Sequence, residues 1–222
     1  MKKIAIVIIA IILIAAGIFV TVHLIGQNEN NHGRNDQQTT APTADALRFK
    51  EEHERYNNTY RDNNEPHLNI TIPTNNTVIY TSFDDLMELM NYGTGVFFFG
   101  RPTCPSCRPI FPGFIQIAMD MDIPLHYYYY MSQDRDAHNA NYVMLLERLH
   151  DYLPVNDRDQ DPGDPGFDPN MKRISVPHIF VVENGEIIAH EMLNRHPYIA
   201  ADNIEGIYDI IRNLFSYYQR IR

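Results

Sequence analysis

The chain has 222 residues, of which 44% are hydrophobic and 21% charged, and its formal net charge is -10. This composition is typical of a folded protein and excludes disordered, collagen-like and coiled-coil chains, while the negative charge argues against nucleic acid as a partner. The two cysteines of the chain stand in a single CxxC. That excludes a disulfide-stapled miniature fold and a four-cysteine zinc or iron–sulfur site built from this chain alone.

The first 25 residues predict a membrane anchor. Lys2 and Lys3 precede an uncharged apolar run of 19 residues, Ile4–Val22, which as a helix spans about 28 Å, close to the thickness of a bilayer core. The two lysines favour a cytoplasmic N-terminus. A cleaved signal peptide is the alternative, but residues 21–25 contain no A-x-A-like cleavage site. We therefore expect residues 1–25 to form a single-pass transmembrane signal anchor in the cell membrane, with the rest of the chain extracellular.

Residues 26–68 are expected to be a polar linker. Gly26–Thr43 is rich in Asn, Gln, Thr and Asp and has almost no large apolar residue, which is typical of a tether. Ala44–Tyr60 has helix-favouring residues but few apolar ones, and it predicts a weak helix or extended linker. The folded domain is then expected over residues 69–222.

The first elements of this domain have clear signals. Asn69–Ser82 alternates and is rich in Ile, Thr and Val, so it predicts a strand with a break at Pro73. Ser82–Tyr92 predicts a helix with Ser82 as N-cap. Gly95–Gly100 reads GVFFFG, a short apolar run typical of a strand buried on both faces.

The later elements complete an alternating order. A helical segment follows the CxxC to about Met121, and Asn184-Gly185 predicts a tight hairpin between two late strands. The remaining expected elements are a strand at Pro124–Met131, a helix at Ala137–Leu153, strands at Val176–Val182 and Glu186–Glu191, and a helix at Ala200–Ile221. The order β-α-β-α-β-α-β-β-α predicts an α/β fold with a central mixed β-sheet flanked by helices.

The CxxC, Cys104 and Cys107, is the motif that carries chemistry. It stands where a buried strand is expected to turn into a helix, with Pro105 suited to the first helical position. The N–H groups of a helix N-terminus, with Arg101 and Arg108 nearby, favour a thiolate and can lower a thiol pKa from about 8.5 to about 3.5–7.5. Such a pair can bond to each other or exchange with an outside disulfide.

Three alternatives use the same residues. The two cysteines with His178 could bind copper(I) in a metallochaperone, since thiolates suit that ion, although His126, His178 and His190 show no ligand spacing to one another. An inert structural disulfide would stabilise the fold little, because it closes so small a ring. A non-catalytic accessory subunit of an exporter would use only its surface.

The chain resembles the thioredoxin-fold thiol–disulfide oxidoreductases over Asn69 to Arg222. The resemblance rests on the FFFG strand before CPSC, on Pro112, on Ser175-Val176-Pro177, and on the Asn184-Gly185 turn. It implies that Cys104 is the more exposed cysteine and attacks a substrate disulfide, that Cys107 resolves the mixed disulfide, and that Pro112 kinks the active-site helix. It also implies that Pro177 is cis and that Val176 pairs with the substrate backbone.

The same resemblance implies protein thiols or disulfides as substrates, a membrane redox partner, and no organic cofactor or metal. The run GRPTCPSC behind an anchor is similar, more narrowly, to Gram-positive bacteriocin transport accessory proteins. Two residues depart from the family pattern: Thr103 replaces an aromatic residue, and Phe98 replaces a buried acid thought to move protons. The second departure argues against efficient reductase turnover of the cytosolic type but not against exchange chemistry.

Two further features lie near the motif. The loop Asp157–Asp168 spaces its carboxylates as a calcium loop does, but Pro162 stands where such loops need Gly. We expect a solvated acidic loop that borders the active site and helps to select the substrate. His178 follows Pro177, so it either tunes the pKa of the cysteines or caps a strand.

Overall fold

The computed structural model describes residues 41–130, 139–156, 163, 165–168, 170–195 and 203–222. Ala41–Arg222 forms one compact unit. In these ranges no helix has both the length and the apolar character that crossing a membrane requires. The predicted anchor over residues 1–25 and the first part of the predicted linker lie outside the described residues.

The unit is built on one mixed five-stranded sheet with the strand order β1-β3-β2-β4-β5. The strands are β1 Val78–Tyr80, β2 Gly95–Gly100, β3 Leu125–Tyr129, β4 His178–Glu183 and β5 Glu186–Met192. β3 is parallel to both β1 and β2, whereas β4 is antiparallel to both β2 and β5. This order is consistent with the thioredoxin-like fold that the sequence resembles.

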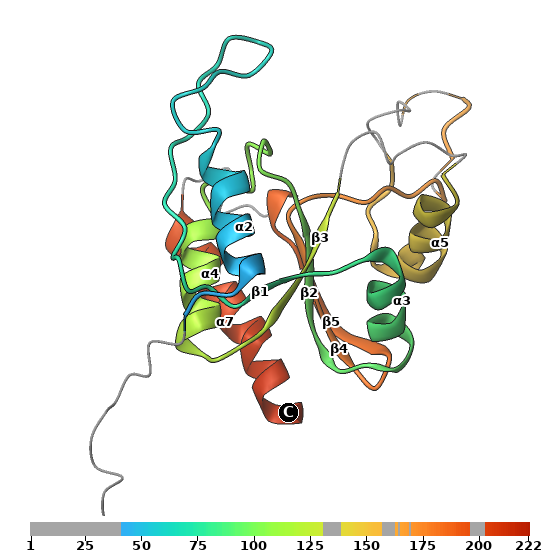
Figure 1. Ribbon diagram of the computed structural model, residues 1–222. Helices are drawn as coiled ribbons and strands as arrows, with labels where there is room; N and C mark the ends of the chain where they lie inside the picture. The colour runs from blue at the N-terminus through green and yellow to red at the C-terminus, as the bar shows by residue number, and fades with distance from the viewer. Residues whose placement is uncertain (1–40, 131–138, 157–162, 164, 169, 196–202) are drawn as a thin grey trace, which may run out of the picture. The chain divides into compact units, whose positions relative to one another are not determined.

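Helices cover both faces of the sheet, as predicted (Figure 1). α2, α4 and α7 lie against one face, and α3 and α5 lie against the other. Their bounds are α2 Ala44–Glu54, α3 Phe83–Tyr92, α4 Phe111–Asp120, α5 Ala140–Leu149 and α7 Ile204–Ile221, with 3₁₀ turns at His150–Tyr152 and Leu193–Arg195. Ser82 caps α3, because its side chain accepts a hydrogen bond from the N–H of Asp85.

The central strand β2 is buried along its whole length, which confirms the prediction from GVFFFG. Its side chains alternate between the faces. Phe97 stacks on Phe180 with ring centroids 4.7 Å apart. On the opposite face, Phe98 meets Phe114 and Tyr127, each with a centroid separation of 4.9 Å. The strand that leads into the CxxC is therefore held between two aromatic layers.

The hairpin predicted at Asn184-Gly185 is present between β4 and β5. Both residues have positive φ, 50° and 83°, as the two-residue turn requires. A Cβ at position 185 would lie 2.1 Å from the main-chain oxygen of Asn91. Glycine is needed here for two independent reasons, conformation and space.

Residues 41–68 of the expected linker are part of the folded unit, which begins at Ala41 and not at Asn69. α2 packs on the sheet through one narrow face of three buried residues, Ala46, Phe49 and His53. The Phe49 ring lies 5.0 Å from that of Tyr127. So small an apolar face explains why the sequence pattern suggested only a weak helix.

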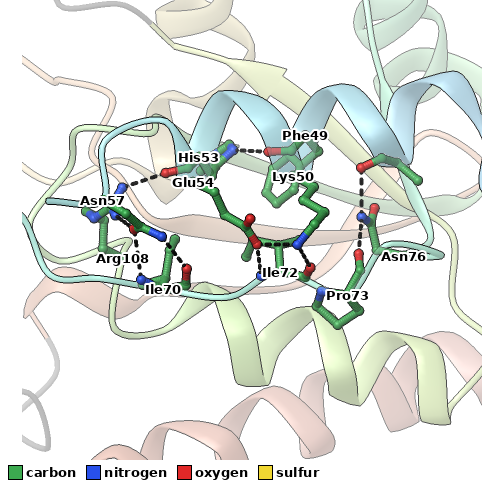
Figure 2. A network of polar contacts seen from close by, with 11 residues as sticks. Phe49, Lys50, His53, Glu54, Asn57, Ile70, Ile72, Pro73, Asn76 and Arg108 are labelled. Atoms are coloured by element: carbon green, nitrogen blue, oxygen red, sulfur yellow. Dashed lines mark hydrogen bonds and ion pairs between the residues drawn. The ribbon is translucent and has the colours of Figure 1, made fainter.

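The strand expected over Asn69–Ser82 is shortened to Val78–Tyr80 because α2 and the turn after it satisfy the preceding backbone (Figure 2). The Asn57 amide bonds both the carbonyl and the N–H of Ile70, at 2.8 and 3.0 Å. At Ile72, the N–H donates to Glu54 at 2.7 Å and the carbonyl accepts from Lys50 at 2.9 Å. Side chains thus take the place of a neighbouring strand.

The helix after the CxxC also begins later than expected. Residues 102–110 form successive turns, and α4 starts only at Phe111. Pro112 therefore lies at the start of α4 and does not kink the middle of a helix, while Pro105 lies in the preceding turns. The missing N–H of Pro112 costs nothing at that position.

Candidate active site around Cys104

The CxxC lies in the turns that leave the carboxyl end of β2. The N–H of Cys107 donates both to the Cys104 carbonyl, at 3.2 Å, and to the Cys104 sulfur, at 3.3 Å. The Cys104 thiol lies 3.8 Å from the Val176 carbonyl oxygen, to which it donates. Both cysteines are free thiols. The turns therefore aim main-chain N–H groups at the first sulfur, a role that was expected of a helix N-terminus.

The two thiols differ sharply in acidity. The pKa of Cys104 is lowered to about 7, first by its hydrogen bond with Cys107 and then by the Cys107 N–H, the charge of Arg101 and the Ser106 N–H, against the effect of burial. Burial raises the pKa of Cys107 well above its ordinary value, and the neighbouring Cys104 raises it further. Near neutral pH the thiolate therefore belongs to Cys104.

Cys104 is the more exposed of the two cysteines, as the resemblance implies, but only 3% of it is exposed, and Cys107 is fully buried. Cys104 instead borders a pocket of about 150 Å³. Three chain segments contribute its lining, which consists of Arg101, Cys104, Pro105, Ser106, Arg173, Ser175, Val176 and Asn194. Access to the first sulfur is therefore through a small pocket and not from an open surface.

The residues predicted to bind substrate lie at this pocket. Val176 lines it, and the Val176–Pro177 peptide bond is cis, as the resemblance implies. Pro177 is buried, and its carbonyl accepts a hydrogen bond from Leu193 at 3.0 Å. The structure thus brings Cys104, Cys107, Val176 and Pro177 together from two distant parts of the sequence.

Arg101, Arg108 and His178 were predicted to tune the pKa of the cysteines, and of these Arg101 lines the pocket. Arg108 is fully buried and turned to the N-terminal segment, where it donates to the carbonyls of Leu68, His53 and Pro102 and to the Asn57 side chain. Within the described residues, all the hydrogen-bond partners of its guanidinium are oxygens, and neither cysteine sulfur is among them.

His178 is buried in β4, and its Nε2 lies 3.1 Å from Nδ1 of His190. Burial, and then the charge of His190, lower the pKa of His178 to about 3, so this ring is neutral at physiological pH. The hydrogen-bond partner of the His178 side chain is therefore His190 and not a cysteine.

The ligand set considered for copper is not assembled. Within the described ranges, no three His, Cys, Asp or Glu side chains are grouped so that they could hold a metal ion. Cys104, Cys107 and His178 therefore do not form such a group. The possible calcium ligands Asp157, Asp159 and Asp161 lie outside the described residues.

Two pocket residues, Arg173 and Asn194, were not among the predicted site residues, and Ser175 was noted only as part of the Ser175-Val176-Pro177 motif. All three line the pocket, and the Asn194 amide donates to the Ser175 hydroxyl at 2.7 Å. Asn194 stands in a 3₁₀ turn after β5 with no local signal, so only the three-dimensional structure reveals it.

Comparison with known proteins gives one structural similarity. No family model and no curated protein matches the chain. Among solved structures, it is similar to the thioredoxin from Aeropyrum pernix, with 15% sequence identity, a TM-score of 0.33, and coverage of 59% of this chain and 86% of that chain. The assignment of a thioredoxin-like fold rests here on the strand order and not on that similarity.

Proposed function

We propose that the protein is a thiol–disulfide oxidoreductase that exchanges disulfides with protein substrates through Cys104 and Cys107. The observation that carries this proposal is the contrast between the two thiols. Cys104 lines a pocket and ionises near neutral pH, whereas Cys107 lies beneath it, fully buried and protonated. An attacking thiol is most effective when its pKa is close to the ambient pH.

The exchange proceeds in two balanced steps. The Cys104 thiolate attacks one sulfur of the substrate disulfide, a Cys104–substrate disulfide forms, and the departing substrate sulfur leaves as a thiolate that takes up a proton. Cys107 then loses its proton and attacks the Cys104 sulfur, which releases the second substrate thiol. The substrate gains two electrons, and the protein is left with a Cys104–Cys107 disulfide; the reverse sequence oxidises a substrate dithiol.

The pocket geometry supports a peptide substrate. Val176 lies at the same pocket as Cys104, so a substrate chain there has main-chain groups of the protein within reach of its cysteine. A pocket of about 150 Å³ accepts a side chain and not a folded domain. The substrate cysteine must therefore lie on an accessible segment.

The proposed location rests on the sequence. The apolar run Ile4–Val22 behind two lysines supports a single-pass anchor in the bacterial cell membrane, with the N-terminus cytoplasmic and the thioredoxin-like domain extracellular. In that location a membrane thiol partner would return the active-site disulfide to dithiol. The GRPTCPSC run behind an anchor supports an association with protein export, as in the bacteriocin accessory proteins.

Trapping in cells tests this proposal. In the Cys107→Ala variant, Cys104 is expected to remain joined to its substrate, and mass spectrometry of the reducible adducts identifies the partner. Cys104→Ser is the matched control and should yield no adduct. If the two variants give the same adducts, or if the purified wild-type protein fails to reduce insulin disulfides with dithiothreitol as donor, the proposal is wrong.

A further inference from the structure

The described lining of the pocket around Cys104 contains arginines and no acidic residue, although the chain as a whole is acidic. The formal net charge is -10, yet among the described residues that line the pocket, none is Asp or Glu and two are arginines, Arg101 and Arg173. A guanidinium in a pocket is suited to bind a carboxylate.

Arg101 is the pocket arginine whose charge acts on the Cys104 sulfur. It is half-buried, and its buried Nε has no hydrogen-bond partner among the described residues. Within the described part of the chain, its guanidinium forms no ion pair with a carboxylate. Its charge acts to lower the pKa of Cys104, and also acts on Cys107 and Tyr129, but of these three groups only Cys104 ionises near neutral pH. Arg101 therefore has the Cys104 thiolate as its anionic neighbour.

That neighbour disappears during the proposed exchange. When the Cys104 thiolate attacks a disulfide, its negative charge leaves with the departing substrate sulfur, and the mixed disulfide that forms is neutral. Arg101 then remains in a partly desolvated pocket without an anion, which is unfavourable. A carboxylate carried by the substrate next to its cysteine would restore the pair at that step.

A second polar group in the pocket is an acceptor. Among the described residues, the buried side-chain oxygen of Asn194 has no hydrogen-bond donor, while its amide nitrogen donates to Ser175. The oxygen is thus fixed in orientation and can accept from an N–H of a bound peptide. The pocket therefore places the Arg101 cation and one oriented acceptor beside the reactive sulfur.

We propose that Arg101 makes the protein selective for disulfides whose cysteine is adjacent to a carboxylate-bearing residue, with Asn194 accepting a hydrogen bond from the peptide main chain. This inference rests on the proposed exchange reaction. The volume of about 150 Å³ equals about five water molecules at about 30 Å³ each. A pocket of this size can contact the substrate residue next to the cysteine and little beyond it.

Two peptide disulfides of identical sequence, except for Asp or Lys beside the cysteine, provide the test. The prereduced full-length protein in detergent micelles reacts with each peptide, and the second-order rate constants are compared as a ratio. Because the same thiolate attacks both peptides, the ratio does not depend on the ionised fraction of Cys104. We expect the wild-type protein to prefer the Asp peptide by about five- to twentyfold at low salt, with a smaller ratio at high salt.

The variants separate the pocket charge from the net charge. Arg101→Gln should bring the ratio close to one, and Arg101→Lys should keep most of it. Arg212→Gln is the matched control, because it removes the same charge from the exposed Arg212–Asp209 pair of α7, and it should leave the ratio unchanged. Equal wild-type rates on both peptides, or an unchanged ratio in Arg101→Gln, would overturn the selectivity while leaving the exchange function intact. Reaction with neither peptide would instead count against the exchange function.

Discussion

Replacing Arg108 by methionine should weaken the folded state through the N-terminal segment and not through the active-site cysteines. Its guanidinium donates to the carbonyl of His53 at 2.8 Å and to the Asn57 side chain at 2.7 Å (Figure 2). It also donates to the carbonyls of Leu68 and Pro102, at 2.6 and 3.0 Å. Methionine fills a similar volume but donates none of these bonds. Four oxygen acceptors from three separate segments would lose this donor, although the Asn57 oxygen would keep its hydrogen bond from the Ile70 N–H.

The magnitude follows from which acceptors water can reach. The bonds to His53 and Pro102 are buried, whereas those to Leu68 and Asn57 are partly buried. A buried acceptor left without a partner costs about 1–3 kcal/mol, so the two buried ones give about 2–6 kcal/mol. Relief of the desolvation that lowers the pKa of Arg108 offsets part of this. We expect a net loss of about 2–4 kcal/mol in the free energy of unfolding.

Urea unfolding followed by circular dichroism measures this loss. For a unit of this size, it should also lower Tm by about 2–4 °C per kcal/mol. Arg108→Lys keeps the charge and up to three donors, so about half of the stability should return. Arg212→Ala, at an exposed ion pair, is the control and should change stability by less than about 1 kcal/mol. If Arg108→Met stays within about 1 kcal/mol of the wild type, the buried network does not hold the segment as we infer.

Three other results are expected. Alkylation of the reduced protein should follow a titration with a midpoint near pH 7 at Cys104 and leave Cys107 unmodified until the protein unfolds, and equal labelling of both thiols would contradict the acidity contrast. Stability should fall as the pH drops below about 6.5, because burial lowers the pKa of His53 to about 4 and that of His178 to about 3 and the unfolded chain therefore binds protons first. Between the unfolded and folded pKa values, each of these histidines should lower the free energy of unfolding by about 1.4 kcal/mol per pH unit. The His53→Phe variant should lose stability less steeply with falling pH, and an equal slope in variant and wild type would refute this. Gly185→Ala should cost more than about 1 kcal/mol, since alanine meets both a φ of 83° and a main-chain oxygen of α3, and an unchanged urea midpoint would show that the turn relaxes.

The elements that could be predicted from sequence have signals contained within their own residues. The apolar run of β2, the Ser82 cap of α3 and the Asn184-Gly185 turn each need only a few neighbouring residues. The alternation of strands and helices also predicts a mixed sheet flanked by helices. Local chemistry therefore determines much of this sheet and its connections.

The features that could not be predicted depend on contacts between distant residues. Asn57 bonds Ile70 and also Arg108, which lies 51 positions further along the chain. A polar side chain gives no sign in the sequence of whether it is solvated or replaces a strand partner. The pocket could not be predicted for the same reason. Asn194 contacts Ser175, 19 positions earlier in the chain, only because the β4–β5 hairpin folds back.

The docking of α2 has a practical consequence for anyone who shortens the chain. A recombinant fragment that starts at Asn69, where the sequence pattern suggests a domain boundary, would lack Phe49 and expose the aromatic face around Tyr127 to solvent. It would also remove three of the four acceptors of the Arg108 guanidinium, which are the carbonyls of Leu68 and His53 and the side chain of Asn57. Such a fragment should aggregate when expressed, whereas one that begins at Ala41 retains the whole compact unit.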